Sequence, residues 1–150
     1  MTRLRWMMIL LMLGVLAGGG FSLYRWSISR HLDQAMTAMQ IRDYPQALQL
    51  LNRYLSHRPA DNRAHLLGAR LNRKTQEYFH AGEHLRRCRE LSGNADAISV
   101  ETELIAVQRG AEPSTRLRDR VDQDDEIASE ILEVLIQYDI DHYQLRPAIH

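Results

Sequence analysis

A turn motif between two helical segments recurs after 34 residues, and this repeat constrains the fold more than any other feature of the chain. Residues 43–47 (DYPQA) reappear as residues 77–81 (EYFHA), and Leu51 and Leu85 follow at the same distance. The segments between the turns carry apolar residues at helical spacing, and none alternates with the period of a strand. Short helices joined by turns of three or four residues cannot each bury a face alone, so we expect antiparallel pairs that stack.

The apolar spacing and the helix-breaking residues predict a series of short helices after residue 28. Asp43 and Pro45 mark one helix start, because aspartate caps free N–H groups and proline fits a first turn. In the segment 126–140 the apolar residues are expected to trace one helical face. The expected helices cover residues 29–41, 45–57, 62–75, 78–91, 95–109, 113–121 and 126–140, with another beginning near residue 144.

The alanine that ends each turn motif is interpreted as a packing residue. Ala47, Ala81 and, further along, Ala148 are small where two helices are expected to cross, since a larger side chain would push the helices apart. This pattern resembles the tetratricopeptide repeat family. The large aromatic residue expected early in each first helix is missing, and His31, His65 and Leu132 stand in its place. The resemblance divides the chain into repeats at 28–61 and 62–95, a degenerate repeat at 96–128 and an incomplete one at 129–150.

The resemblance implies an all-α solenoid that binds other proteins and has no chemistry of its own. Roles such as assembly scaffold, chaperone-like adaptor or organiser of an envelope complex follow from it, with no catalytic residue and no cofactor. Partner binding is expected on the concave surface, which the first helix of each repeat forms. The polar Gln34 and Asn72 are the residues most expected to contact a partner's backbone. The candidate partner-binding residues are Gln34, Ala38, Gly68, Asn72, Glu103 and Ala106.

The N-terminal segment predicts a membrane anchor. After a short basic segment at residues 1–5, residues 6–24 carry no charge, and a helix of this length matches the ~30 Å hydrocarbon core of a bilayer. We therefore expect a transmembrane helix at residues 6–25, a single-pass protein of the bacterial inner membrane and repeats in the periplasm. Ala17 to Gly20 could instead end a cleaved signal peptide, and the chain would then be a soluble secreted adaptor.

A short motif in the second repeat offers an enzymatic alternative. His80, Glu83 and His84 match H-x-x-E-H, and Cys88 follows on the same helical stripe with a ligand type that suits zinc. Such a site would make the chain a zinc-dependent hydrolase in which the glutamate activates water. The motif falls on the second helix of a well-matched repeat, where Ala81 and Cys88 hold packing positions, so we favour a structural role and expect no metal site.

Charge is distributed unevenly although the net charge is zero. Residues 1–118 hold 17 basic and 10 acidic side chains, and residues 119–150 hold two basic and nine acidic ones. This asymmetry suggests self-association, or docking of further repeats, through opposite charges. Residues 53–89 contain nine basic and three acidic side chains. Without interleaved aromatic residues this cluster predicts a solvated helix face, or a surface for lipid headgroups or acidic partners, and no nucleic-acid binding.

The last repeat lacks its second helix. The sequence stops two residues after Ala148, so the segment 126–140 would keep an exposed apolar face, and solenoids need a polar cap. We therefore expect the chain to be a fragment of a longer repeat array.

Overall fold

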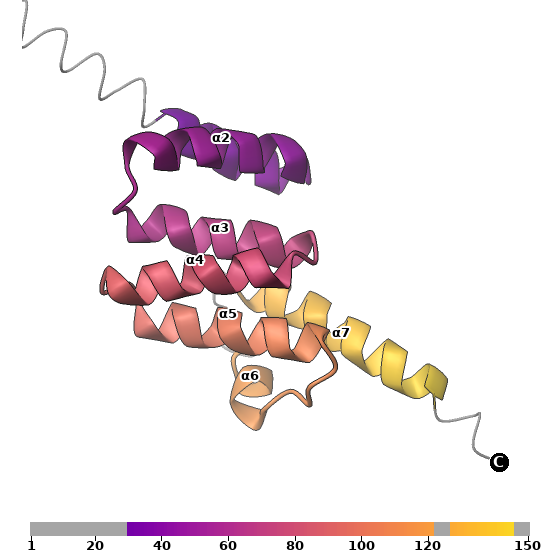
Figure 1. The fold of residues 1–150 in the computed structure, drawn as a ribbon. Coiled ribbons are helices and arrows are strands. Elements are labelled where there is room, and N and C mark those ends of the chain that lie inside the picture. The colour runs from indigo at the N-terminus through magenta and orange to yellow at the C-terminus, as the bar shows by residue number, and fades with distance from the viewer. Residues whose placement is uncertain (1–29, 122–126, 146–150) are drawn as a thin grey trace, which may run out of the picture. The chain divides into compact units, whose positions relative to one another are not determined.

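The computed structural model describes residues 30–121 and 127–145 and divides into two compact units, Met1–Ala60 and Asp61–His150. The described residues form helices and connecting turns without a strand, which confirms the all-α class (Figure 1). The predicted anchor at residues 6–25 lies outside the described residues. None of the helices within the described ranges is both long enough and apolar enough to span a bilayer.

The first unit contains a helix over residues 30–40 and α2 (Tyr44–His57). The side chain of Asp43 accepts a hydrogen bond from the backbone N–H of Gln46 at 3.1 Å, and Pro45 lies in the first turn, so α2 begins as predicted. Ala47 and Leu51, the residues of the repeated motif, are fully buried on one face of α2.

The second unit is a stack of helices in which neighbours along the chain pack side by side (Figure 1). Its first two helices form a tightly packed hairpin, α5 packs against both of them, and α7 packs against α5 and α6. Side chains of Asp61, Asn94 and Ser114 cap the starts of three helices. The helices are α3 (Asn62–Lys74), α4 (Tyr78–Glu90), α5 (Ala95–Gln108), α6 (Thr115–Asp119) and α7 (Ala128–Leu145).

One turn geometry occurs three times at intervals of 34 residues, and once more between α4 and α5, where Ser92 has a φ of 55° and the N–H of Gly93 donates to the carbonyl oxygen of Cys88 at 2.8 Å. The backbone takes a positive φ at Arg42 (62°), Gln76 (64°) and Gly110 (96°). After each of these residues, a backbone N–H donates to the carbonyl oxygen five residues earlier, at 2.9, 2.8 and 3.0 Å. These hydrogen bonds close a helix end in the Schellman manner. The period found in the sequence is therefore a period of the backbone, and it extends into the segment 96–128, where the sequence match is weak.

The last helices differ from the prediction. The helix expected over 113–121 is shorter in the structure, where it forms α6. It begins after Ser114, because the Ser114 side chain caps the helix and the Ser114 backbone N–H donates to Glu103 of α5 at 3.0 Å. The predicted end at residue 140, with a new helix near 144, is wrong: α7 continues to Leu145. No glycine or proline interrupts this segment, and the ring of His142 stacks on Tyr138 one turn earlier, with ring centroids 3.9 Å apart.

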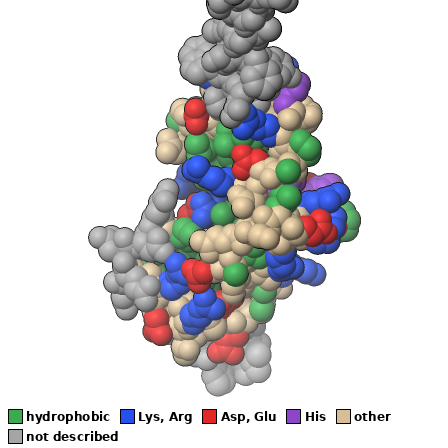
Figure 2. Space-filling model, turned by 90° about the vertical axis from the view of Figure 1, so that its left-hand side faces the viewer, with side chains coloured by type: hydrophobic (Ala, Val, Ile, Leu, Met, Phe, Trp, Pro, Cys, Tyr) green, Lys and Arg blue, Asp and Glu red, His purple; other side chains and the backbone are tan. Residues whose placement is uncertain are grey.

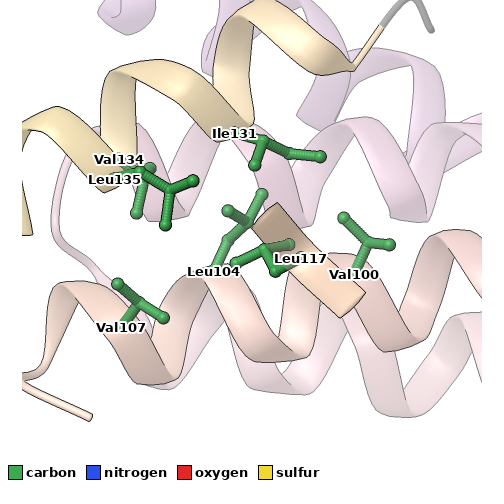
Figure 3. Close-up of a cluster of buried hydrophobic side chains, with 7 residues drawn as sticks. All are labelled: Val100, Leu104, Val107, Leu117, Ile131, Val134 and Leu135. Atoms are coloured by element: carbon green, nitrogen blue, oxygen red, sulfur yellow. The ribbon is translucent and has the colours of Figure 1, made fainter. Parts of the chain in front are cut away.

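The interface between α5 and α7 is a buried apolar cluster (Figure 3). Val100, Leu104 and Val107 project from α5 towards α7, and Leu117 of α6 lies beside them. From α7 the cluster receives Ile131, Val134 and Leu135. The apolar residues predicted to share one face of this helix therefore lie on two faces. One face is buried in the cluster, and the other carries Leu132, Ile136 and Ile140, which are exposed.

The interface between α3 and α5 consists of charged residues, which stand at the repeat positions that hold apolar residues between α5 and α7. Arg73 is 1% exposed, and its Nε lies 2.8 Å from the carboxylate of the fully buried Glu101. Arg70 binds the other oxygen of Glu101 at 3.0 Å. Leu104, Val107 and Leu135 stand 34 positions after Arg70, Arg73 and Glu101, respectively. Consecutive interfaces therefore use equivalent positions, once for ion pairs and once for apolar packing.

Candidate functional site

A groove of about 550 Å³ runs along one face of α5 and is bordered by the end of α4. Most side chains that line it are small or short, and they recur at intervals of three or four residues, which places them on one side of the helix. Arg89 and Glu103 contribute opposite charges. The groove is lined by Arg89, Gly93, Ala95, Ile98, Ser99, Thr102, Glu103 and Ala106.

Hydrogen bonds hold the polar residues of the groove in place. Arg89 donates to the hydroxyl of Thr102 at 3.3 Å, and that hydroxyl donates to the carbonyl oxygen of Ile98 at 2.7 Å. Glu103 accepts a hydrogen bond from the backbone N–H of Ser114. Because these side chains are already held, the groove would lose less conformational entropy when a segment binds, and the small residues would let the segment's backbone come close to α5.

Glu103 and Ala106 are the two predicted partner-binding residues that the structure brings together in this groove. Gln34 is exposed on the helix over residues 30–40, and Ala38 is buried, in the first unit. Gly68 and Asn72 are buried in α3. Three of the six residues, at positions 38, 72 and 106, supply the carbonyl oxygens that close the repeated turns. These three positions therefore occupy the same place in the repeated turn.

The two candidates in α3 have internal contacts. The side-chain amide of Asn72 donates to the carbonyl oxygen of Gly68 at 2.8 Å. A Cβ atom on Gly68 would lie 2.7–2.8 Å from three ring atoms of His84 in α4, so glycine provides the space for that ring. Gly68 thus serves the packing of α3 against α4, and the side chain of Asn72 bonds within α3.

The residues of the H-x-x-E-H motif do not converge. His84 turns towards α3, where its Nδ1 lies 3.0 Å from Nδ1 of His65, while His80 is exposed and its ring contacts Phe79. Glu83 is exposed and pairs with Arg86 at 3.0 Å. Cys88 is buried and its Sγ donates to the carbonyl oxygen of Asn62 at 3.4 Å. Across residues 30–121 and 127–145, no group of three or more histidine, cysteine or acidic side chains is arranged to hold a metal ion.

Burial and the neighbouring His65 and His80 lower the pKa of His84 to about 4, against a smaller opposite effect of Glu83. His84 is therefore neutral at pH 7. One of the two facing nitrogen atoms carries a proton and the other accepts it, so a neutral pair satisfies the contact. A second proton between the rings would place two positive charges at hydrogen-bond distance.

The basic cluster at residues 53–89 is largely engaged in pairs with acids. Arg73 also binds Glu130 of α7 at 2.7 Å, and Lys74 binds Glu133 at 3.2 Å. Arg86 and Arg87 pair with acids of their own helix. On the face in Figure 2, basic and acidic side chains are interspersed. Two acidic residues near the C-terminal end thus pair with basic residues of α3 within the same molecule.

A second hollow, of about 490 Å³, lies where α6 meets the start of α5. Asp96 pairs there with Arg116 and Arg120, and the hydrogen bond from Arg120 is the main cause that lowers the pKa of Asp96. The charges of this hollow are matched internally, which leaves the groove on α5 as the stronger candidate.

Sequence reasoning missed Arg89, Ser99 and Thr102 in the groove and Glu101 in the core. Ser99 and Thr102 could have been found, because residues 95, 98, 99, 102, 103 and 106 share one helical face with mostly small side chains, whereas Arg89 comes from α4. The burial of Glu101 depends on arginines about 30 positions earlier, and no local pattern reveals it.

Comparisons of the chain with protein-family models, with curated proteins and with solved structures give no match.

Proposed function

We propose that the chain is a tetratricopeptide-like scaffold or adaptor that binds a segment of another protein in the groove on α5. The observation that carries this proposal is the groove itself, with its small residues along α5 and the opposite charges of Arg89 and Glu103. Stacked helices whose turns recur every 34 residues support the repeat assignment. A bound segment would combine apolar contact with Ala95 and Ala106 and ion pairing at the two charged residues.

The N-terminal segment completes the proposed function. Residues 6–25 would anchor the scaffold in the bacterial inner membrane and hold the groove in the periplasm, where it would bring a partner to the membrane. Extraction of membranes with sodium carbonate tests this part. The anchor predicts that the chain stays in the membrane pellet with its N-terminus intact; release of a trimmed chain would mean a cleaved signal and a secreted adaptor.

Selection from a random peptide library tests the groove. The full-length chain is held in lipid nanodiscs, and enriched peptides are measured against the wild type, Ser99→Trp and Gln108→Trp. Both positions are exposed on α5, but only Ser99 lines the groove. We expect Ser99→Trp to lower affinity at least about tenfold and Gln108→Trp to leave it unchanged. Equal binding by all three proteins would rule out the groove as the binding site.

A further inference from the structure

The exposed side of α7 carries three apolar residues in one line. Leu132, Ile136 and Ile140 follow one another at intervals of four residues and are 44, 51 and 45% exposed. The other side of α7 is already buried against α5 and α6 in the cluster of Figure 3. A helix with apolar residues on two sides needs a neighbour on each to remove them from water.

The register of the repeat indicates what kind of neighbour fits this line. Leu135 stands 34 positions after Glu101 in equivalent interfaces, and Ala106 stands 34 positions after Asn72 in equivalent turns. The three exposed residues of α7 therefore correspond, two repeats earlier, to positions 64, 68 and 72 of α3.

In α3 these three positions are buried, and α4 covers the middle one. The ring of His84 in α4 lies directly over Gly68, and it also contacts His65. In α5 the equivalent positions 98, 102 and 106 line the groove described above. The line on α7 thus occupies the side that a second helix covers in the complete hairpin of α3 and α4.

The charges of α7 favour a basic neighbour. The helix contains four acidic residues and no lysine or arginine. Glu130 and Glu133 approach Arg73 and Lys74 of α3, while Asp139 and Asp141 are exposed near the other end of the helix. Glu133 and Asp139 flank the apolar line on its two sides. A covering helix with arginine or lysine beside its apolar residues would meet these carboxylates, whereas a second copy of α7 would bring like charges together.

We propose that Leu132, Ile136 and Ile140 form a docking site for an amphipathic α-helix of a partner protein, with basic residues beside its apolar stripe. The bound helix would lie along α7 as α4 lies along α3 and would bury the exposed line. This site is separate from the groove on α5, so the chain would engage two segments at once.

A pair of designed peptides provides the probe. Both are 18-residue helices with the same leucine and alanine stripe, and one carries arginine and the other glutamate beside the stripe. Binding to the full-length chain in nanodiscs is measured by fluorescence anisotropy at low and high salt. We expect the arginine peptide to bind at least about tenfold more tightly than the glutamate peptide, with an advantage that shrinks as salt increases.

Substitutions locate the site. Ile136→Ser in α7 should lower the affinity for the arginine peptide about tenfold or more. Phe79→Ser, which changes an exposed apolar residue of α4, should leave that affinity unchanged. Circular dichroism checks that both variants keep the helical content of the wild type. Ser99→Trp should also leave this binding intact, which separates the docking site from the groove.

Three results would overturn the proposal. The peptides could bind equally well, or Ile136→Ser could bind as the wild type does. In the third, sedimentation would show wild-type dimers that Ile136→Ser abolishes, and the occupant would then be a second copy of the chain.

Discussion

Nδ1 of His65 and Nδ1 of His84 lie 3.0 Å apart between α3 and α4, and the ring of His84 fills the space that a side chain at position 68 would need. His84 of the H-x-x-E-H motif and the glycine at position 68 thus take part in the packing of one helix pair, α3 and α4. It accounts for Gly68 and His84 through structure, without a ligand.

The first prediction concerns pH. Because the pKa of His84 is lowered to about 4 in the folded chain, the unfolded chain takes up a proton at this residue between pH 6.5 and 4 that the folded chain does not. This contribution is complete above pH 6.5 and is lost as the pH falls. We expect the free energy of unfolding to drop by about 1–2 kcal/mol between pH 7 and pH 5 through this residue.

Urea unfolding of the wild type, His84→Leu and His80→Leu between pH 7 and pH 5 measures this effect. His84→Leu should lose that part of the pH dependence, while His80→Leu, at an exposed residue that lowers the pKa of His84 less than burial and His65 do, should keep most of it. Parallel curves for the wild type and His84→Leu would show that the contact with His65 does not hold His84 neutral.

The second prediction compares two helical glycines. Gly68→Ala would place a Cβ atom within 2.8 Å of the ring of His84, so we expect a loss of about 1–3 kcal/mol, partly offset by helix propensity. Gly82→Ala in α4 meets no atom within 4 Å and should stabilise by about 0.5–1 kcal/mol. Thermal melts of both variants give the comparison, and the same sign for both would contradict the packing described for Gly68.

The third prediction concerns the buried charges between α3 and α5. Glu101→Ala removes the fully buried one of the two carboxylates that bind Arg73, which is 1% exposed, so we expect a loss of about 3–5 kcal/mol. Glu90→Ala, which removes an exposed acid that pairs within α4, should cost less than about 1 kcal/mol. Equal effects in urea unfolding would mean that Glu101 is not buried in solution.

A triple variant tests the equivalence of the two interfaces. Arg70→Leu, Arg73→Val and Glu101→Leu together install the residues that stand 34 positions later. Replacing a buried ion network by well-packed apolar residues is often neutral or stabilising. The triple variant should therefore be clearly more stable than Glu101→Ala alone. A protein as unstable as the single variant would argue against the shared register.

The fourth prediction concerns Cys88. Its side chain is 1% exposed, and burial raises the pKa of its thiol, so a thiol reagent should react slowly with the folded chain and rapidly in urea. A Cβ atom on Gly93 would lie 2.4 Å from its Sγ atom, so Gly93→Ala should expose the thiol and speed its reaction. Equal labelling rates of folded and unfolded wild-type chain would contradict the burial.

Local signals in the sequence were sufficient for much of the fold. The turn motif, its capping aspartate and its crossing alanine depend on residues close in sequence, and for that reason the helix starts and the buried Ala47 and Ala81 agree with the prediction. The predicted end of α7 at residue 140 was wrong. Residues 141–144 contain no glycine or proline that would end a helix, so α7 continues to Leu145.

The rest depended on contacts between helices that are distant in sequence. Glu101 stands among both polar and apolar residues, next to Thr102 and near Glu103, and only the approach of α3 provides the arginines that allow its burial. The repeat period selected candidate binding residues by position, but His84 of α4 lies over Gly68 and the buried Asn72 bonds within α3. The 34-residue period identifies the positions that are equivalent in successive repeats. It does not identify which of these positions are exposed to solvent and which are covered by another helix.

Site-specific photocrosslinking tests the central claim, that the groove on α5 binds a protein segment. A photoreactive phenylalanine analogue is placed at Ser99 in the groove or at Gln108 outside it, in the full-length chain produced in bacterial cells. The account predicts a discrete crosslinked species of higher mass from position 99 and none from position 108. No adduct at either position, or the same adducts at both, would contradict it.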